Sequence, residues 1–309
     1  MSDGLAWTDL LDPDEAELRA AAQVDLGPQI VRELLRPADP EGATRPTLLG
    51  AGDYVFGILL AAVFDRGRDL LIYQEIDLVI MQDSILTVRK TPSGHEPFDL
   101  ASVRETCEAR GHFQPGMIAF HLVDEVAERY LDLLDDIDNE IDELEEHVDD
   151  WTPEQVRVRL SELRHDLLHI RRTLSPTRDA VRRVVDGRVD VSAGQLQQEI
   201  FPPDVERAFS GVLDKLLRSS ESLEFSRDLL AAVRDYQQNK VASDQNEVTK
   251  RLTAIAAILL FPTFVVGVYG QNFDHMPELH WRLGYAYSWA VIVVVTIGQV
   301  VYFRRKRWL

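Results

Sequence analysis

Two long uncharged stretches near the C-terminus constrain the fold most strongly. Residues 252–273 and 283–303 contain 22 and 21 residues without a charged side chain. At ~1.5 Å rise per residue, about 20 helical residues cross the ~30 Å hydrocarbon core of a bilayer. Burial inside a soluble core is the weaker interpretation, because aromatic residues cluster at both ends of the second stretch, as they do at membrane interfaces. These aromatic residues are Trp281, Tyr285, Tyr287, Trp289, Tyr302, Phe303 and Trp308. We therefore expect two transmembrane helices.

The orientation of these helices follows from the charges around them. Residues 304–307 are all Arg or Lys and directly follow the second stretch, so the positive-inside rule places them in the cytoplasm. Two spans return the N-terminus to the same side, and residues 1–17 lack the features of a signal or transit peptide. We expect a multi-pass protein of the plasma (inner) membrane with both termini cytoplasmic and an outer loop at about 271–282.

The overall charge excludes some function classes. A formal net charge of −19 argues against a nucleic-acid partner, which requires a basic face, and favours cations instead. The single cysteine, Cys107, excludes an internal disulfide and a cysteine-rich metal cage. No nucleophile motif, metal triad or phosphate loop is recognisable, so we expect neither an enzyme nor a bound cofactor.

The first part of the chain has the pattern of a small α/β domain, for which we expect the bounds 1–112. The stretches 53–64 and 70–80 have strand character, and a turn at 81–84 leads into a third strand at 85–89. The glycines of this region do not match the spacing of a dinucleotide-binding loop.

The middle of the chain has a helical pattern, for which we expect the bounds 113–250, followed by a transmembrane domain at 251–309. Helices are predicted at 117–148 and 153–186. A third helix begins after Pro203 and meets no breaker before Pro262, so one helix extends into the first membrane span. Its apolar seam alternates steps of four and three, as in coiled coils. The seam consists of Val205, Phe209, Val212, Leu216, Ser219, Leu223, Ser226, Leu230 and Val233. The whole chain is thus mainly α: an α+β cytosolic domain, a long-helix stalk and two C-terminal transmembrane helices.

A short motif ends the first uncharged stretch. It reads Tyr269-Gly270-Gln271-Asn272-Phe273 and is followed by Met276-Pro277-Glu278-Leu279. The sequence here resembles the CorA family of divalent-cation channels, whose signature is YGMNF followed by MPEL at the outer end of the first of two C-terminal helices. The resemblance covers residues 115–309 well and the N-terminal domain loosely. Gln271 departs from the family, which has methionine there.

The resemblance implies a homopentamer that passes Mg²⁺ through a pore, with Gly270, Gln271 and Asn272 as the selectivity filter. A ring of Asn272 amides would offer neutral oxygen atoms to the hydration shell of Mg²⁺, which gives up water reluctantly. A helix-capping role is the alternative for Asn272. Glu278 would gather cations at the outer mouth, or is an ordinary solvated charge.

The resemblance also assigns a pore wall and a regulatory metal site. The pore wall would comprise Thr249, Leu252, Leu260, Thr263 and Gly267, with the two leucines as hydrophobic constrictions. Intracellular Mg²⁺ would bridge subunits through Asp235 and, less directly, Glu33. If the resemblance is set aside, the five pore residues are ordinary residues on a helix face, and Asp235 and Glu33 are ordinary solvated carboxylates.

Several alternatives stay open at this point. Co²⁺ and Ni²⁺ are alternatives to Mg²⁺ as the transported ion. Another alternative is a zinc transporter of the same superfamily, with or without proton coupling. A non-conducting membrane sensor is a further alternative, because Gln271 alters the filter. His165 and His169 lie one helical turn apart as a candidate zinc pair, although an ordinary surface role fits them better. The acidic stretch 131–150 is either a solvated helix face or a group of negative charges that offsets the positive charge of residues 304–307.

Overall fold

The computed structural model describes residues 7–38, 44–65, 70–189, 199–271, 276 and 280–309. The chain divides into two compact units, Met1–Val233 and Arg234–Leu309. Helix α6, Pro203–Tyr269, contributes its first part to the first unit and the remainder to the second.

A five-stranded mixed sheet organises the first unit, in the order β1-β5-β4-β3-β2. Its centre is the long antiparallel pair β3 (Val55–Asp65) and β4 (Leu70–Ile80). The amide of Met81 donates a 2.9 Å hydrogen bond to the carbonyl of Ser84 and closes the hairpin into β5 (Ile85–Arg89), which confirms the predicted turn. The short strands β1 (Trp7–Leu11) and β2 (Thr47–Gly50) form the edges, and the sequence pattern did not predict them.

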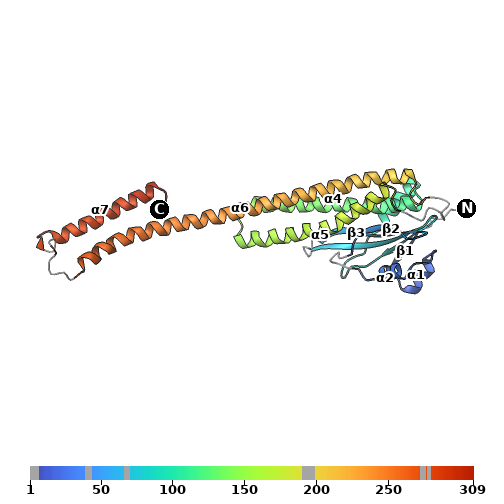
Figure 1. Cartoon of the computed structure of the whole chain (residues 1–309), viewed down its shortest axis with the longest axis horizontal. Helices are drawn as coiled ribbons and strands as arrows, with labels where there is room; N and C mark the ends of the chain where they lie inside the picture. Colours follow the sequence, from blue (N-terminus) through green and yellow to red (C-terminus); the bar gives the residue numbers. More distant parts are fainter. Residues whose placement is uncertain (1–6, 39–43, 66–69, 190–198, 272–275, 277–279) are drawn as a thin grey trace. The chain divides into compact units, whose positions relative to one another are not determined.

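Helices cover both faces of this sheet, which explains why nearly every residue of β3 and β4 is shielded from solvent. On one face, α1 (Glu15–Ala21) and α2 (Pro28–Leu34) enclose a small core with residues such as Phe56 and Val88. On the other, α3 (Ala101–Arg110), α4 (Pro115–His147) and α5 (Pro153–Val185) share a larger core with the sheet (Figure 1).

The predicted long helices are confirmed, and local signals explain their ends. Pro115 and Pro153 occupy the first turns of α4 and α5, where the missing N–H costs no helical hydrogen bond. Thr152 and Gln155 form a reciprocal capping box at the start of α5. All nine residues of the predicted seam on α6 are buried, from Val205 at 0% to Val233 at 6% exposure.

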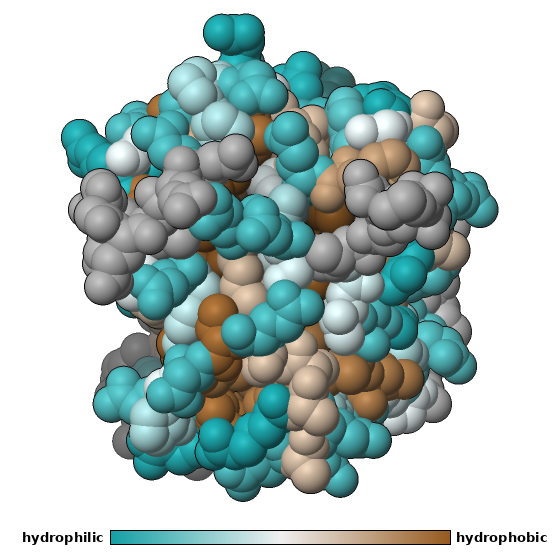
Figure 2. Space-filling view, turned by 90° about the vertical axis from the view of Figure 1, so that its right-hand side faces the viewer, coloured by the Kyte–Doolittle hydropathy of each residue, from teal (hydrophilic) through white to brown (hydrophobic). Residues whose placement is uncertain are grey.

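The second unit consists of the remainder of α6 and of α7 (Gly284–Arg305). Both helices are long and apolar enough to cross a membrane. Large hydrophobic side chains on them are exposed, among them Leu260, Phe264 and Val294 at 65–69%. The face of the molecule in Figure 2 differs: hydrophilic residues dominate it and hydrophobic ones form smaller patches. The fold class expected from the sequence, mainly α with an α+β part and two C-terminal membrane helices, is confirmed.

A buried charge cluster lies in the sheet of the first unit. Glu75, Asp77 and Lys90 are at most 2% exposed. The Lys90 ammonium lies 2.6 Å from Glu75 Oε1 and 2.7 Å from Asp77 Oδ2, and Arg36 lies 3.3 Å from Glu75. Neither Asp77 oxygen accepts a well-oriented hydrogen bond from the described residues. Burial therefore raises the pKa of Asp77 well above its ordinary value, although Lys90 opposes the shift.

This raised pKa links stability to pH. Between the ordinary pKa of an aspartate, about 4, and the raised value, folded Asp77 holds a proton that the unfolded chain has lost. Proton binding by folded Asp77 therefore adds to the free energy of unfolding. This contribution is complete below the ordinary pKa and is lost as pH rises toward the raised pKa. We expect the full chain in detergent to lose stability from pH 5 to pH 8 relative to Asp77→Asn, whose amide stays neutral. Denaturation midpoints over a pH series would measure this, and parallel curves for the two proteins would contradict it.

A close backbone approach fixes the start of α4. A Cβ added at Gly116 would collide with the carbonyl oxygen of Ile200, whereas one added at Gly211, on α6, would meet nothing within 4 Å. We expect Gly116→Ala to lower the free energy of unfolding by about 1–3 kcal/mol, because neighbouring backbone must move. The control, Gly211→Ala, should raise it by about 0.5–1 kcal/mol, because alanine is the better helix former. Denaturant unfolding of both variants would test this, and equal effects would refute the packing explanation.

Candidate functional site

The membrane part of α6 has two different faces. One face is buried or half-buried within the second unit. It consists of Ala254, Ala257, Ile258, Phe261, Pro262, Val265, Val268 and Tyr269. Each of these residues has another of the group three or four positions away, so together they form one stripe along the helix. A hydrogen bond of 3.4 Å from Gln299 Nε2 of α7 to the carbonyl of Ala257 shows that this stripe faces α7.

The five residues predicted to line a pore lie on the other face. Thr249, Leu252, Leu260, Thr263 and Gly267 are all exposed. At about 100° per residue they fall within an arc of roughly 80°, whose centre is roughly opposite the centre of the buried stripe. Within one chain, therefore, the structure brings the five residues together on a single open face. It does not show what that face contacts.

The chemistry of this arc is mixed. The hydroxyls of Thr249 and Thr263 each donate a 2.8 Å hydrogen bond to the carbonyl four residues earlier, so their oxygen atoms retain acceptor capacity. Leu252 and Leu260 are 62% and 69% exposed, and a Cβ at Gly267 would meet nothing within 4 Å. The arc therefore carries two hydroxyl oxygen acceptors and two exposed leucine side chains, and none of its five residues is charged.

The helix ends at the motif that carries the family resemblance. The amide of Gly270 donates a 2.8 Å hydrogen bond to Val266, and that of Gln271 a 3.3 Å hydrogen bond to Val268, which tightens the last turn. Gly270 falls on the same arc as the five pore-face residues. The predicted filter residue Asn272 and the loop residue Glu278 lie outside the described residues, so their geometry stays a prediction.

The two predicted regulatory carboxylates belong to different units, and each has an arginine neighbour. Asp235, on α6, lies 3.1 Å from Arg234, and Glu33, on α2, lies 3.6 Å from Arg36. Their side chains are 63% and 40% exposed, so neither is held in a preformed cage. Within the described part of the chain, no group of three or more His, Cys, Asp or Glu side chains could hold a metal ion.

The candidate zinc pair, His165 and His169, also lacks a third metal ligand among the described residues. The rings of His165 and His169 lie 4.2 Å apart between centroids, as their spacing on α5 predicts. Among the residues that the structure describes, they do not gather a third metal ligand. Zinc sites in proteins use three or four protein ligands. The pair alone therefore does not define a zinc site.

The fold combines an α/β unit with a unit of two helices that are long and apolar enough to cross a membrane. The family model described as "CorA-like Mg2+ transporter protein" matches residues 2–305. The chain belongs to this family, which is one of transporters and not a class of enzymes.

Individual relatives agree with this assignment. The cobalt/magnesium transport protein CorA of Thermotoga maritima is 29% identical over 86% of this chain and 73% of its own length. The magnesium transport protein CorA of Salmonella typhimurium is 25% identical over 98% of this chain and 92% of its own length. The chain also has the fold of the CorA magnesium transporter from Methanocaldococcus jannaschii, with a TM-score of 0.76, 19% identity, and coverage of 100% of this chain and 93% of that one.

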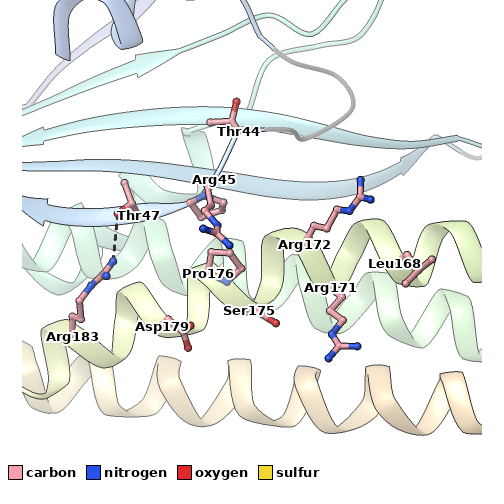
Figure 3. Close-up of a pocket in the computed structure, with 11 residues that line it drawn as sticks. Thr44, Arg45, Thr47, Leu168, Arg171, Arg172, Ser175, Pro176, Asp179 and Arg183 are labelled. Atoms are coloured by element: carbon pink, nitrogen blue, oxygen red, sulfur yellow. Dashed lines mark hydrogen bonds between the residues drawn. The ribbon is translucent and has the colours of Figure 1, made fainter. Parts of the chain in front are cut away.

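Sequence reasoning missed two groups of residues in the first unit. One is the buried cluster around Lys90, although Glu75 and Asp77 alternate within an apolar strand and must therefore point to one face. The other is a group of arginines between β2 and α5 (Figure 3). No local pattern joins Arg45 to the other three arginines, because Arg45 precedes β2 whereas the others belong to α5, far away in the sequence.

Proposed function

We propose that the chain transports divalent metal cations, principally Mg²⁺, with Co²⁺ or Ni²⁺ as further ions, through a pore built by several copies of itself. The main observation in support is the open arc on α6, opposite the stripe that faces α7, in a chain of the CorA family. Named relatives transport magnesium or cobalt and magnesium. The copy number that we propose is five, by the resemblance to the family.

A pore requires more than one copy because two helices cannot enclose a path. In a single chain the arc is open, and α6 is exposed almost all round from Arg234 to Thr253. Symmetry-related copies of α6 would place their arcs around a common axis and cover this surface. The apolar outer surface of α7 would then face lipid.

The proposed filter consists of Gly270, Gln271 and Asn272. Repeated around the axis, Asn272 supplies amide oxygens that bind the water shell of Mg²⁺ without stripping it. Gln271 adds a second amide where the family has methionine, so it can bind the same water or the outer loop. Glu278 would raise the local concentration of cations at the mouth. Leu252 and Leu260 would close the path by excluding water.

The driving force needs no cofactor. A membrane potential contributes ~2.3 kcal/mol per charge per 100 mV, and twice that for a divalent cation. Inward flow therefore follows an inside-negative potential. We place the protein in the plasma (inner) membrane with both termini in the cytoplasm, because the basic residues 304–307 lie at the C-terminal end of α7.

Regulation by intracellular metal would use Asp235 and Glu33. Each carboxylate is accessible, and the ion-pair partner that the described residues give it is an arginine close by in the sequence, so a hydrated Mg²⁺ can bind it from outside the chain. An ion held between the carboxylates of adjacent copies would stabilise one arrangement of the oligomer. Falling intracellular Mg²⁺ would then release that arrangement.

Flux measurements test the proposal directly. Reconstituted protein should carry Mg²⁺ into vesicles with an inside-negative potential, and Asn272→Ala should abolish most of this flux because the ring of acceptors is lost. The matched control, Asn139→Ala, changes an exposed asparagine of α4 and should leave the flux unchanged.

Two results would contradict the magnesium assignment. Flux of Zn²⁺ alone that depends on a pH gradient would identify a proton-coupled zinc transporter. Absence of any divalent flux in the wild type would identify a non-conducting sensor.

Single cysteines test which face of α6 meets water. The native Cys107 is fully buried, so an introduced thiol reports its own position. Thr263→Cys, on the open arc, should react with a cationic, water-soluble thiol reagent, and the reaction should block flux. Val265→Cys, on the stripe that faces α7, should react much more slowly, because its side chain is only 9% exposed. Faster reaction at position 265 would refute the proposed pore face.

A further inference from the structure

A cleft with an unusual charge lies within the first unit, apart from the membrane helices. It has a volume of about 980 Å³ and lies between residues 44–47, at the start of β2, and the second half of α5 (Figure 3). Four arginines line it, against a single carboxylate, Asp179. The whole chain carries a net charge of −19, so this concentration of positive charge opposes the general trend.

Three of the arginines remain available to a ligand. Arg171 points away from the sheet and lies 3.8 Å from Glu224 of α6. Arg45, Arg172 and Arg183 form no ion pair with any residue in the described ranges. The carboxylate of Asp179 does not neutralise them, because Arg178 lies 3.1 Å from it.

The three side chains reach the cleft from both of its walls. Figure 3 shows Arg45 descending from the strand side, while Arg172 and Arg183 rise from α5 toward the sheet. Arg183 donates a 3.3 Å hydrogen bond from Nη2 to Thr47 Oγ1, which holds its guanidinium at the cleft. Its Nε is buried and has no hydrogen-bond partner in the described structure. Because this nitrogen is shielded, a ligand in the cleft would bind the remaining N–H groups of the Arg183 guanidinium.

The lining also selects the kind of anion. Guanidinium groups bind phosphate oxygens through paired, charge-assisted hydrogen bonds, and three of them match more than one phosphate. Pro46 and Pro176 add apolar surface beside the charges. The volume falls within the range of sites that hold small molecules, roughly 300–1,000 Å³. A single inorganic phosphate would leave most of this space and at least one arginine unused.

We propose that this cleft binds a small soluble anion with two or more phosphate groups, of which a nucleoside triphosphate is the representative. Arg45, Arg172 and Arg183 bind the phosphates, and the proline surface contacts the organic part. The proposal is independent of ion transport, because every residue involved lies in the first unit.

Binding to the full chain in detergent tests the proposal. We would titrate ATP and inorganic triphosphate by calorimetry in the presence of a chelator, so that metal binding does not contribute heat. ATP should bind at one site per chain, adenosine should not bind, and triphosphate should compete with ATP. Arg172→Ala should weaken ATP binding about tenfold or more, as expected for the loss of a charge-assisted hydrogen bond.

Matched variants separate the cleft from general charge effects. Arg164→Ala removes an exposed arginine from the same helix outside the cleft and should leave the affinity unchanged. Arg45→Ala changes an exposed side chain without an ion-pair partner in the described structure, so it should weaken binding without affecting the thermal unfolding midpoint. Absence of ATP binding, equal binding of adenosine, or equal losses in Arg45→Ala and Arg164→Ala would each overturn the proposal.

Discussion

A helix that crosses a bilayer must satisfy its backbone hydrogen bonds internally, because hydrocarbon offers no substitute for water. Helix α6 satisfies this requirement, except where Pro262 has no N–H to donate to the carbonyl of Ile258, with the same helical geometry that builds a soluble core at its other end. Its first part buries a seam of nine residues, from Val205 to Val233, and its last part is uncharged through Tyr269. The remaining architecture depends on α6 being one continuous helix, because the same element packs in a water-soluble core at one end and is apolar enough for a bilayer at the other.

The features that sequence predicts best are those with a long, regular pattern. The strands β3 and β4, the three long helices and the membrane spans each keep an apolar run or an apolar period over eleven residues or more. The elements that were missed have at most ten residues: β2 has four, β1 has five, α1 and α2 have seven each, and α3 has ten. In such segments tertiary packing decides the conformation, and a few residues do not establish a period.

In the candidate site, too, sequence predicts what a regular helical pattern determines and misses what depends on tertiary or intermolecular packing. The spacing of Thr249, Leu260 and Thr263 already determines that they share a face, and the exposed side of α6 agrees with that expectation. Which partner covers the face depends on other copies of the chain, and no local pattern contains that information. The arginines of the cleft were unpredictable for a related reason: Arg45 and Arg183 become neighbours only when β2 packs beside α5.

The seam of α6 ends where the first compact unit ends, at Val233. Every residue in the two hydrophobic cores of the described structure lies at or before that position. Substitutions beyond it therefore leave both cores chemically unchanged. Over evolutionary time, residues of the membrane part can vary in response to lipid and ion without compensating changes in the sheet. In relatives of this chain, the two parts of the sequence are thus free to diverge at different rates.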